Sequence, residues 1–293
     1  MYAIETSSLT KLFDKTKAVD NLDLTVKSGE IFGLVGPDGA GKTTTIRLLC
    51  GLLTPKSGYA KVLGFDTIKQ TERLKENFGY MSQKFSLYQD LTVEENLNFF
   101  ADIRKVKKAD REERKKRLFE FSRLDKFKDR LAGKLSGGMK QKLALSCTLI
   151  HTPKILFLDE PTTGVDPISR KEFWDILKSF EGQMTIFVST PYMDEAEKCA
   201  NVALMHNGSI LVKDTPQKIK ALMPQKVIEL TSSDIRKAAQ MLEGKVDYEM
   251  FGDRLHIVSD DIEAVRNAGN FTLKEISPSL EDVFVWMIKK NTR

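Results

Sequence analysis

The order of apolar and polar positions predicts a chain in which strands and helices alternate. Apolar and polar residues alternate in two short runs, around Ile4 and over residues 22–26, and this favours an antiparallel meander at the start of the chain. Continuous apolar runs over residues 31–35, 155–158 and 185–189 predict buried strands, and helical patterns come between them. Strands that alternate with helices indicate a parallel sheet, whose ligands bind at the carboxyl ends of its strands.

Two changes of pattern predict the domain organisation. From about residue 84 to residue 150 the chain becomes helical and heavily charged, so we expect a helical subdomain there. After a Met-Pro pair at 223–224 the pattern restarts as β-α-β-β-α-β, an order that resembles a small ferredoxin-like domain. We therefore predict an α/β domain over residues 1–222 and an α+β accessory domain over residues 223–293. The helices expected in the accessory domain cover residues 233–242, 261–268 and 280–289.

Length and composition agree with a globular protein of about two domains. The chain has 293 residues, of which 41% are hydrophobic and 30% charged. No apolar run approaches the ~18 residues of a membrane-spanning helix, and the first residues do not resemble a signal peptide. A net charge of +5 does not by itself imply a nucleic-acid partner. Cys50, Cys147 and Cys199 lack metal-ligand spacing, so we expect buried thiols in a reducing compartment and a cytosolic protein.

The basic stretch over residues 104–117 has two interpretations. Acids are interleaved among its bases, which favours a solvated helix face. The alternative is contact with anionic lipid headgroups.

One glycine-rich stretch predicts a binding site for a nucleoside triphosphate. It fits G-x-x-x-x-G-K-[ST], the phosphate-binding loop of nucleotide hydrolases, and it follows a buried strand and precedes a helical pattern. Glycines let the backbone N–H groups wrap around a phosphate, and the helix that follows adds its positive end. Lys42 is expected to reach the β- and γ-phosphates, and the Thr43 hydroxyl to coordinate Mg²⁺. The stretch consists of Gly36, Pro37, Asp38, Gly39, Ala40, Gly41, Lys42, Thr43 and Thr44.

Two adjacent carboxylates end the apolar strand over residues 155–160. Strand alternation would point Asp159 and Glu160 to different sides, which suits two separate tasks. We predict that Asp159 holds Mg²⁺ and that Glu160 orients or deprotonates an attacking water.

Other residues leave alternatives open when they are considered alone. Ser136, Gly137 and Gly138 precede a helical pattern and could accept an anion, but a plain helix cap explains them equally well. Phe13 could contact a ligand, although a lone aromatic residue is more often part of a core.

Over essentially residues 1–222 the chain resembles the nucleotide-binding subunit of an ABC transporter. The motifs that carry this resemblance occur in the family's order: Walker A over 36–43, the Q-loop at Gln83, the LSGGQ-type signature over 135–141 with Met139 in the Gln position, Walker B over 155–160, the D-loop at Asp166, and the adenine-stacking aromatic residue at Phe13. The resemblance implies a P-loop ABC core with an antiparallel β meander and a helical subdomain. Residues 278–284 resemble part of the appendage of daunorubicin-exporter and YbhF-like multidrug export ATPases.

The resemblance also implies cofactors and partners. ATP and Mg²⁺ would bind, with Gln83 as a further metal ligand and Asp166 at the catalytic site. Ser136, Gly137, Gly138 and Met139 would close on ATP held by the opposite subunit of a head-to-tail dimer. A separate membrane permease would seat in a groove near Gln83, so the chain would lie at the cytoplasmic face of the membrane. Phe85, Leu87 and Tyr88 are the candidates that line this groove, and ordinary local core is the alternative for them.

Two positions depart from the family's pattern. Asp38 stands where Asn is usual, and it adds a negative charge near the phosphates. Pro191 stands where the switch His is usual, and proline has no side-chain donor and no backbone N–H. Since losing one preorganised donor typically costs ~10²–10³ in rate, we predict that this site holds ATP but hydrolyses it slowly. A heterodimer with a complete second site is therefore favoured over a homodimer.

Three functions remain in consideration. The first is an ATPase subunit that drives an export permease. The second is a regulatory subunit that clamps ATP with little turnover. The third is a non-transport ABC ATPase acting on nucleic acid or ribosomes, which normally carries two cores or a long coiled coil; this sequence shows neither, and no nucleic-acid partner is expected.

Overall fold

The computed structural model describes residues 1–84, 87–244, 246, 248–258, 265–266 and 271–292. Its contacts divide the chain into two units, Met1–Lys213 and Asp214–Arg293. The boundary predicted after residue 222 therefore lies within the second unit. The reason is that helix α8 (Pro216–Lys220) packs against helix α11 (Leu280–Thr292).

A six-stranded sheet forms the centre of the first unit, in the order β10-β9-β3-β8-β7-β6. The strands β9, β3, β8, β7 and β6 are parallel neighbours, as the alternation of strands and helices predicted. Every residue of β3, β7 and β8 is buried, which explains their continuous apolar runs. The strands are β3 (Ile31–Val35), β6 (Phe78–Met81), β7 (Ile155–Asp159), β8 (Thr185–Thr190), β9 (Asn201–His206) and β10 (Ser209–Asp214).

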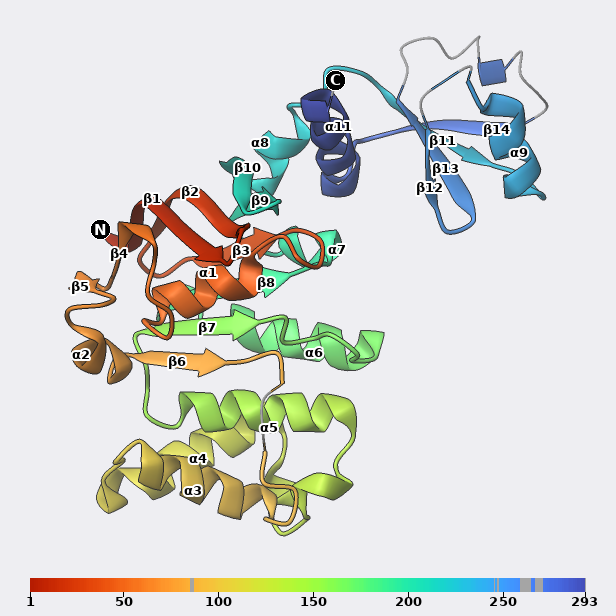
Figure 1. Cartoon of the computed structure of the whole chain (residues 1–293). Coiled ribbons are helices and arrows are strands. Elements are labelled where there is room, and N and C mark those ends of the chain that lie inside the picture. The colour runs from red at the N-terminus through yellow and green to blue at the C-terminus, as the bar shows by residue number, and fades with distance from the viewer. Residues whose placement is uncertain (85–86, 245, 247, 259–264, 267–270, 293) are drawn as a thin grey trace. The chain divides into compact units, whose positions relative to one another are not determined.

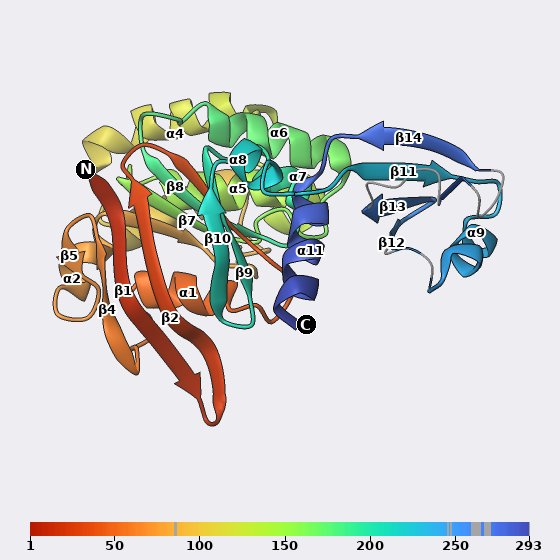
Figure 2. The ribbon, with the colours of Figure 1, turned by 90° about the horizontal axis from the view of Figure 1, so that it is seen from above.

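A second, four-stranded sheet has the order β2-β1-β4-β5. Its strands are β1 (Tyr2–Phe13), β2 (Thr16–Lys27), β4 (Ser57–Val62) and β5 (Phe65–Asp66). The antiparallel pairing of β1 with β2 and β4 accounts for the predicted meander. Helix α1 (Lys42–Leu49) contacts strands of both sheets, so the main core lies between them around α1. Figure 2 shows the hairpin of β1 and β2 projecting from the rest of this unit.

Helices α3 (Val93–Ile103), α4 (Lys108–Ser122) and α5 (Gly137–Leu149) pack together below the parallel sheet in the view of Figure 1. The other α-helices among the described residues of this unit are α2 (Thr71–Lys75), α6 (Pro167–Lys178) and α7 (Met193–Ala196). Much of the basic stretch lies on α4, where acids of α4 and of α3 pair with its bases. Within α4, Arg114 pairs with Asp110 and Lys115 with Glu112; from α3, Asp102 pairs with Arg111 and Glu94 with Lys115. This pairing agrees with the interpretation as a solvated helix face.

The second unit contains an antiparallel sheet in the order β12-β13-β11-β14. Its strands are β11 (Val227–Thr231), β12 (Tyr248–Phe251), β13 (Arg254–Val258) and β14 (Thr272–Ile276), and helix α9 (Ile235–Leu242) packs on it. This order is the one expected for a split β-α-β arrangement, as the sequence predicted. The helix expected over residues 261–268 lies mostly outside the described residues.

Two properties of the whole chain bear on its chemistry. Among the described residues, no helix is long and apolar enough to cross a membrane. The three cysteines are buried and unpaired, and burial raises the pKa of each thiol, so the thiols remain protonated and inert.

Candidate functional site

The predicted phosphate-binding loop connects β3 to α1, and two of its glycines have no room for a side chain. A Cβ on Gly36 would lie 2.1 Å from the backbone oxygen of Met205. Gly41 has φ +107°, and a Cβ there would lie 2.3 Å from the oxygen of Ala18. Gly41 also caps α1 without any side-chain cap, so the first N–H groups of the helix remain open to an anion. Close packing and backbone conformation therefore both require glycine here.

The Lys42 side chain forms an ion pair with the predicted general base. Its Nζ lies 3.1 Å from Oε1 of Glu160, and the two side chains are only 3% and 7% exposed. The same Nζ donates hydrogen bonds to the oxygens of Gly36, at 2.8 Å, and Pro37, at 2.9 Å. The charge of Lys42 thus compensates the buried carboxylate and also ties down the loop.

Asp159 has the features of a cation ligand. Its Oδ1 accepts hydrogen bonds from the hydroxyls of Thr43, at 3.0 Å, and Ser189, at 2.8 Å. Its Oδ2 is buried and has no hydrogen-bond partner among the described residues. A buried carboxylate oxygen without a partner is costly, and a hard cation such as Mg²⁺ would satisfy it. The donor set of Asp159 and Thr43 therefore fits the predicted metal.

The backbone of Glu160 is strained, and this sets the direction of its side chain. Its φ is +48°, in the left-handed region that residues other than glycine rarely occupy. Its N–H donates to both the oxygen and the hydroxyl of Ser189, at 3.1 Å each. Since β7 ends at Asp159, the strand alternation on which the predicted placement rested does not extend to Glu160. The two carboxylates instead contact consecutive residues, Lys42 and Thr43, and keep separate partners.

Gln83, predicted as a metal ligand, contacts the site through Glu160. Its Nε2 donates to Oε2 of Glu160 at 3.0 Å. Of the residues proposed for a permease groove, Phe85 lies outside the described residues and Leu87 is half-buried. Tyr88 is 47% exposed, and its ring packs edge-on against Phe99 with 4.3 Å between ring centroids.

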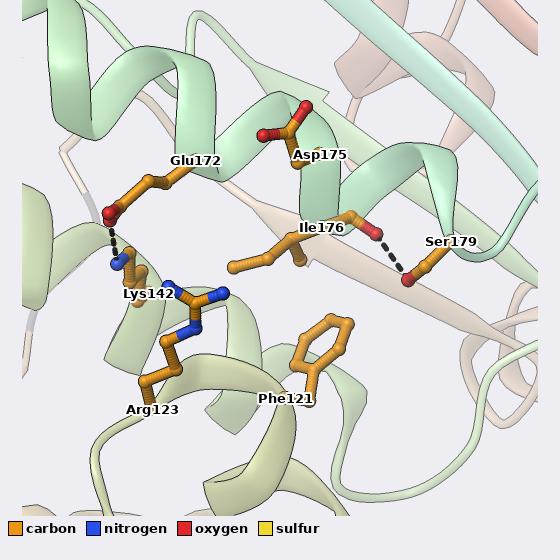
Figure 3. Close-up of a pocket in the computed structure, with 7 residues that line it drawn as sticks. All are labelled: Phe121, Arg123, Lys142, Glu172, Asp175, Ile176 and Ser179. Carbon is orange, nitrogen blue, oxygen red and sulfur yellow. Dashed lines mark hydrogen bonds and ion pairs between the residues drawn. The ribbon is translucent and has the colours of Figure 1, made fainter.

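The predicted signature residues lie at the start of α5. Ser136 caps this helix by accepting a hydrogen bond from the N–H of Met139 at 3.3 Å. Ser136 and Gly137 are exposed, whereas Gly138 is buried against α6, where a Cβ would lie 2.3 Å from the Ser169 hydroxyl. One turn further along, Lys142 pairs with Glu172 of α6 beside a cavity of about 290 Å³ (Figure 3). Ser136 therefore caps α5 and, like Gly137, remains accessible to another molecule.

Three other predicted residues are placed as follows. Asp166 caps α6 by accepting from the N–H of Ser169 at 2.9 Å, and this hydrogen bond lowers the pKa of its carboxyl group. Phe13 is 47% exposed at the end of β1, so it is not a core residue. Asp38 is exposed on the phosphate-binding loop, and Pro191 is half-buried directly after β8.

Sequence reasoning missed two residues of this site. Ser189 faces Asp159 in the register of β7 and β8, and it holds both Asp159 and Glu160. A polar residue at the carboxyl end of an apolar strand was the available signal. Glu195, fully buried on α7, accepts hydrogen bonds from Thr162 and Thr190. Nothing in the local sequence indicated its burial.

The chain resembles known proteins in both sequence and fold. A family model described as ABC transporter matches residues 19–163. The chain is 45% identical over 280 residues to a probable multidrug ABC transporter ATP-binding protein, YbhF, of Escherichia coli (strain K12). That alignment covers 92% of this chain and 48% of YbhF, so the chain spans about half the length of this relative.

In two further matches, the alignment covers most of the length of the matched protein. The chain is 37% identical over 240 residues to the daunorubicin/doxorubicin resistance ATP-binding protein DrrA of Streptomyces peucetius, covering 81% of this chain and 73% of DrrA. A solved structure titled "Structure of ATP binding subunit of ABC transporter" superposes with a TM-score of 0.68 at 28% identity, covering 75% of this chain and 92% of the other.

Proposed function

Because this chain belongs to the family of ABC transporter ATP-binding proteins, we propose that it binds and hydrolyses ATP as the ATPase subunit of an export system. The observation that carries the proposal is the buried pair of Lys42 and Glu160 beside the glycine loop. It joins a phosphate-binding lysine to a general base at the carboxyl end of a parallel sheet. The names of YbhF and DrrA, which refer to multidrug transport and drug resistance, support export rather than another direction of transport.

Thr43 and Asp159 would hold Mg²⁺, with Gln83 completing the protein's share of ligands. When bound, the ion neutralises charge on the β- and γ-phosphates. The free Oδ2 of Asp159 is the observation that favours this assignment. Ser189 orients the same carboxylate through its Oδ1.

Binding of a triphosphate requires Lys42 to change partners. Its Nζ now contacts Glu160, and it would exchange that carboxylate for phosphate oxygens. Glu160 would then be free of its lysine and able to orient or deprotonate the attacking water. Gln83 would keep the hydrogen bond from its Nε2 to Oε2 of Glu160, and its amide oxygen would be the metal ligand. Phe13, exposed at the end of β1, would stack on the adenine base.

Hydrolysis at this site should be slow because Pro191 supplies no donor to the γ-phosphate or the water. Asp38 adds an exposed negative charge to the loop. Binding should survive, since the glycines, Lys42, Thr43 and Asp159 do not depend on position 191.

Two chains would form the complete sites. The exposed Ser136 and Gly137, with Gly138 and Met139, would close on ATP held by the opposite subunit, and the D-loop at Asp166 would lie at the same interface. A homodimer would contain two slow sites. A heterodimer would let this chain's signature segment serve a partner's faster site, so we favour a heterodimer.

ATP binding to this subunit would drive a conformational change in a separate permease. The exposed Tyr88 and the half-buried Leu87, close in sequence to Gln83, are the proposed contacts for it. This arrangement would place the chain at the cytoplasmic face of the membrane. The second candidate function is a regulatory subunit that clamps ATP with negligible turnover. Pro191 favours it, because proline supplies no donor for hydrolysis.

The proposal is tested by equilibrium ATP binding and single-turnover hydrolysis of the purified protein. Wild type should bind Mg-ATP, Lys42→Ala should lose binding, and Glu160→Gln should bind ATP but not hydrolyse it. Failure of the wild type to bind Mg-ATP overturns the proposal. Binding unaffected by Lys42→Ala would move the site away from the glycine loop.

A further inference from the structure

A buried carboxylate joins the two segments that flank the reaction site. Glu195 of α7 is fully buried, and its Oε2 accepts a hydrogen bond from the Thr190 hydroxyl at 2.6 Å. Its Oε1 accepts from the Thr162 hydroxyl. Thr162 follows Glu160 by two positions, and Thr190 immediately precedes Pro191. One carboxylate thus connects the loop that carries the general base to the segment that carries the switch position.

Arg170 of α6 compensates the charge of this carboxylate. Its Nε lies 3.6 Å from Oε1 of Glu195, and its Nη1 lies 3.9 Å from Oδ2 of Asp194. Its guanidinium carbon also lies 4.3 Å from the ring centroid of Tyr192. A carboxylate buried without a cation is strongly unfavourable, and Arg170 places a positive charge next to Glu195.

The backbone on both sides of Pro191 is held by the same group. The Thr190 hydroxyl, besides donating to Glu195, accepts a hydrogen bond from the N–H of Tyr192 at 3.1 Å. Proline fixes its own φ and offers no N–H. The course of residues 190–192 therefore depends on Thr190 and, through it, on Glu195.

We propose that Glu195 and Arg170 are positioning residues for hydrolysis, which hold the segment around Pro191 in fixed register with Glu160. This inference rests on the proposed function. The strained backbone of Glu160 supports it, because a left-handed residue other than glycine persists only where its surroundings hold it in place. Ser189 fixes the N–H of Glu160 from one side, and the contact between Thr162 and Glu195 fixes the following loop from the other.

The network also connects to the signature segment. Ser169, the residue before Arg170, lies where a Cβ on Gly138 would clash, so the start of α5 bears directly on this part of α6. A displacement of α5 against α6 would therefore shift Arg170 and, through Glu195, the segment around Pro191.

The test compares Thr190→Val with Thr190→Ser. Valine keeps the shape and removes the hydroxyl, whereas serine keeps the hydroxyl. Since small misplacements at a reacting centre can cost up to ~10²-fold in rate, we expect Thr190→Val to lower the single-turnover rate about ten-fold or more. The Kd for Mg-ATP should change less than two-fold, roughly, because the Thr190 hydroxyl does not contact the phosphate-binding loop. Thr190 meets the loop through its backbone oxygen, which accepts from the N–H of Gly36 at 3.3 Å and is retained in the variant. Thr190→Ser should retain most of the rate.

Thr148→Val is the matched control, because the Thr148 hydroxyl is also buried but bonds only the helix oxygen of Ala144. It should lower the melting temperature without lowering the rate. Arg170→Lys, which keeps the charge, should lie between wild type and Thr190→Val, and it provides a second test if the valine variant does not fold. All variants are also made with Pro191→His, so that a slow wild type does not limit the measurement.

Equal single-turnover rates for Thr190→Val and wild type in both backgrounds overturn the positioning role, and so does the absence of hydrolysis in both. A parallel loss of ATP affinity would also overturn it, since the network would then serve binding. The proposed function is tested separately by Mg-ATP binding to the wild type, and a failure to bind would overturn that proposal but is distinct from the outcomes above.

Discussion

Lys42 and Glu160 neutralise each other inside the first unit, with 3.1 Å between Nζ and Oε1. Removing one partner of a buried pair typically costs about 3–5 kcal/mol, since the other charge is left uncompensated. We expect Lys42→Met to lower the free energy of unfolding by about that amount, and Lys42→Met with Glu160→Gln to recover much of it. Denaturant unfolding of both variants measures this. A double variant no more stable than the single one would show that the two charges do not compensate each other.

Restoring a donor at position 191 should accelerate hydrolysis. We expect Pro191→His to raise the single-turnover rate by about ten-fold or more, because one preorganised donor is worth ~10²–10³ in related sites and this one enters an unadapted segment. The Kd for Mg-ATP should stay within about two-fold of the wild-type value, since the new donor acts in the transition state and not on bound ATP. Wild-type turnover at ordinary rates, with no gain from histidine, would refute the slow-site proposal.

Two adjacent glycines provide a matched comparison at the start of α5. Gly138→Ala places a Cβ 2.3 Å from the Ser169 hydroxyl and should destabilise the protein by about 1–3 kcal/mol. Gly137→Ala meets nothing within 4 Å and should leave stability unchanged or slightly improved, as alanine favours helix. If Gly137 closes on a partner's ATP, its variant should still weaken ATP-dependent dimerisation, which light scattering measures. Equal stability losses would contradict the packing of α5 on α6.

His151 should make stability fall in acid. Burial, with the charges of Arg104 and Arg114, lowers the pKa of His151 from 6.5 to about 4. The unfolded chain then binds the proton more readily than the folded one, so this contribution is complete above pH 6.5 and is lost as the pH falls to about 4.

The loss over that window should be about 2–3 kcal/mol, since each pKa unit corresponds to about 1.4 kcal/mol and the ring is partly exposed. Replacing His151 with Asn should remove this part of the pH dependence, which denaturant unfolding at several pH values detects. An unchanged profile in the variant would assign the acid sensitivity to other groups.

The local motifs were readable from the sequence because they depend on short-range physics. A phosphate-binding loop requires glycines and a lysine within nine residues, and a buried parallel strand requires a continuous apolar run, so residues 36–44 and the strands around them were predicted. The order of the motifs also identified the family and its fold. The two carboxylates after 155–158 were found in the same way.

What only the tertiary structure decided is which of these residues meet. Lys42 and Glu160 are distant in the sequence, as are Thr43 and Asp159 with 116 positions between them, and Ser189 lies 30 positions from Asp159. No local pattern encodes these contacts or the unpartnered oxygen of Asp159. The left-handed backbone of Glu160 overrode strand alternation for the same reason, since contacts from a neighbouring strand hold it. No sequence pattern indicated a role for Glu195, and only packing against Thr162, Thr190 and Arg170 placed its carboxylate beside the proposed reaction site.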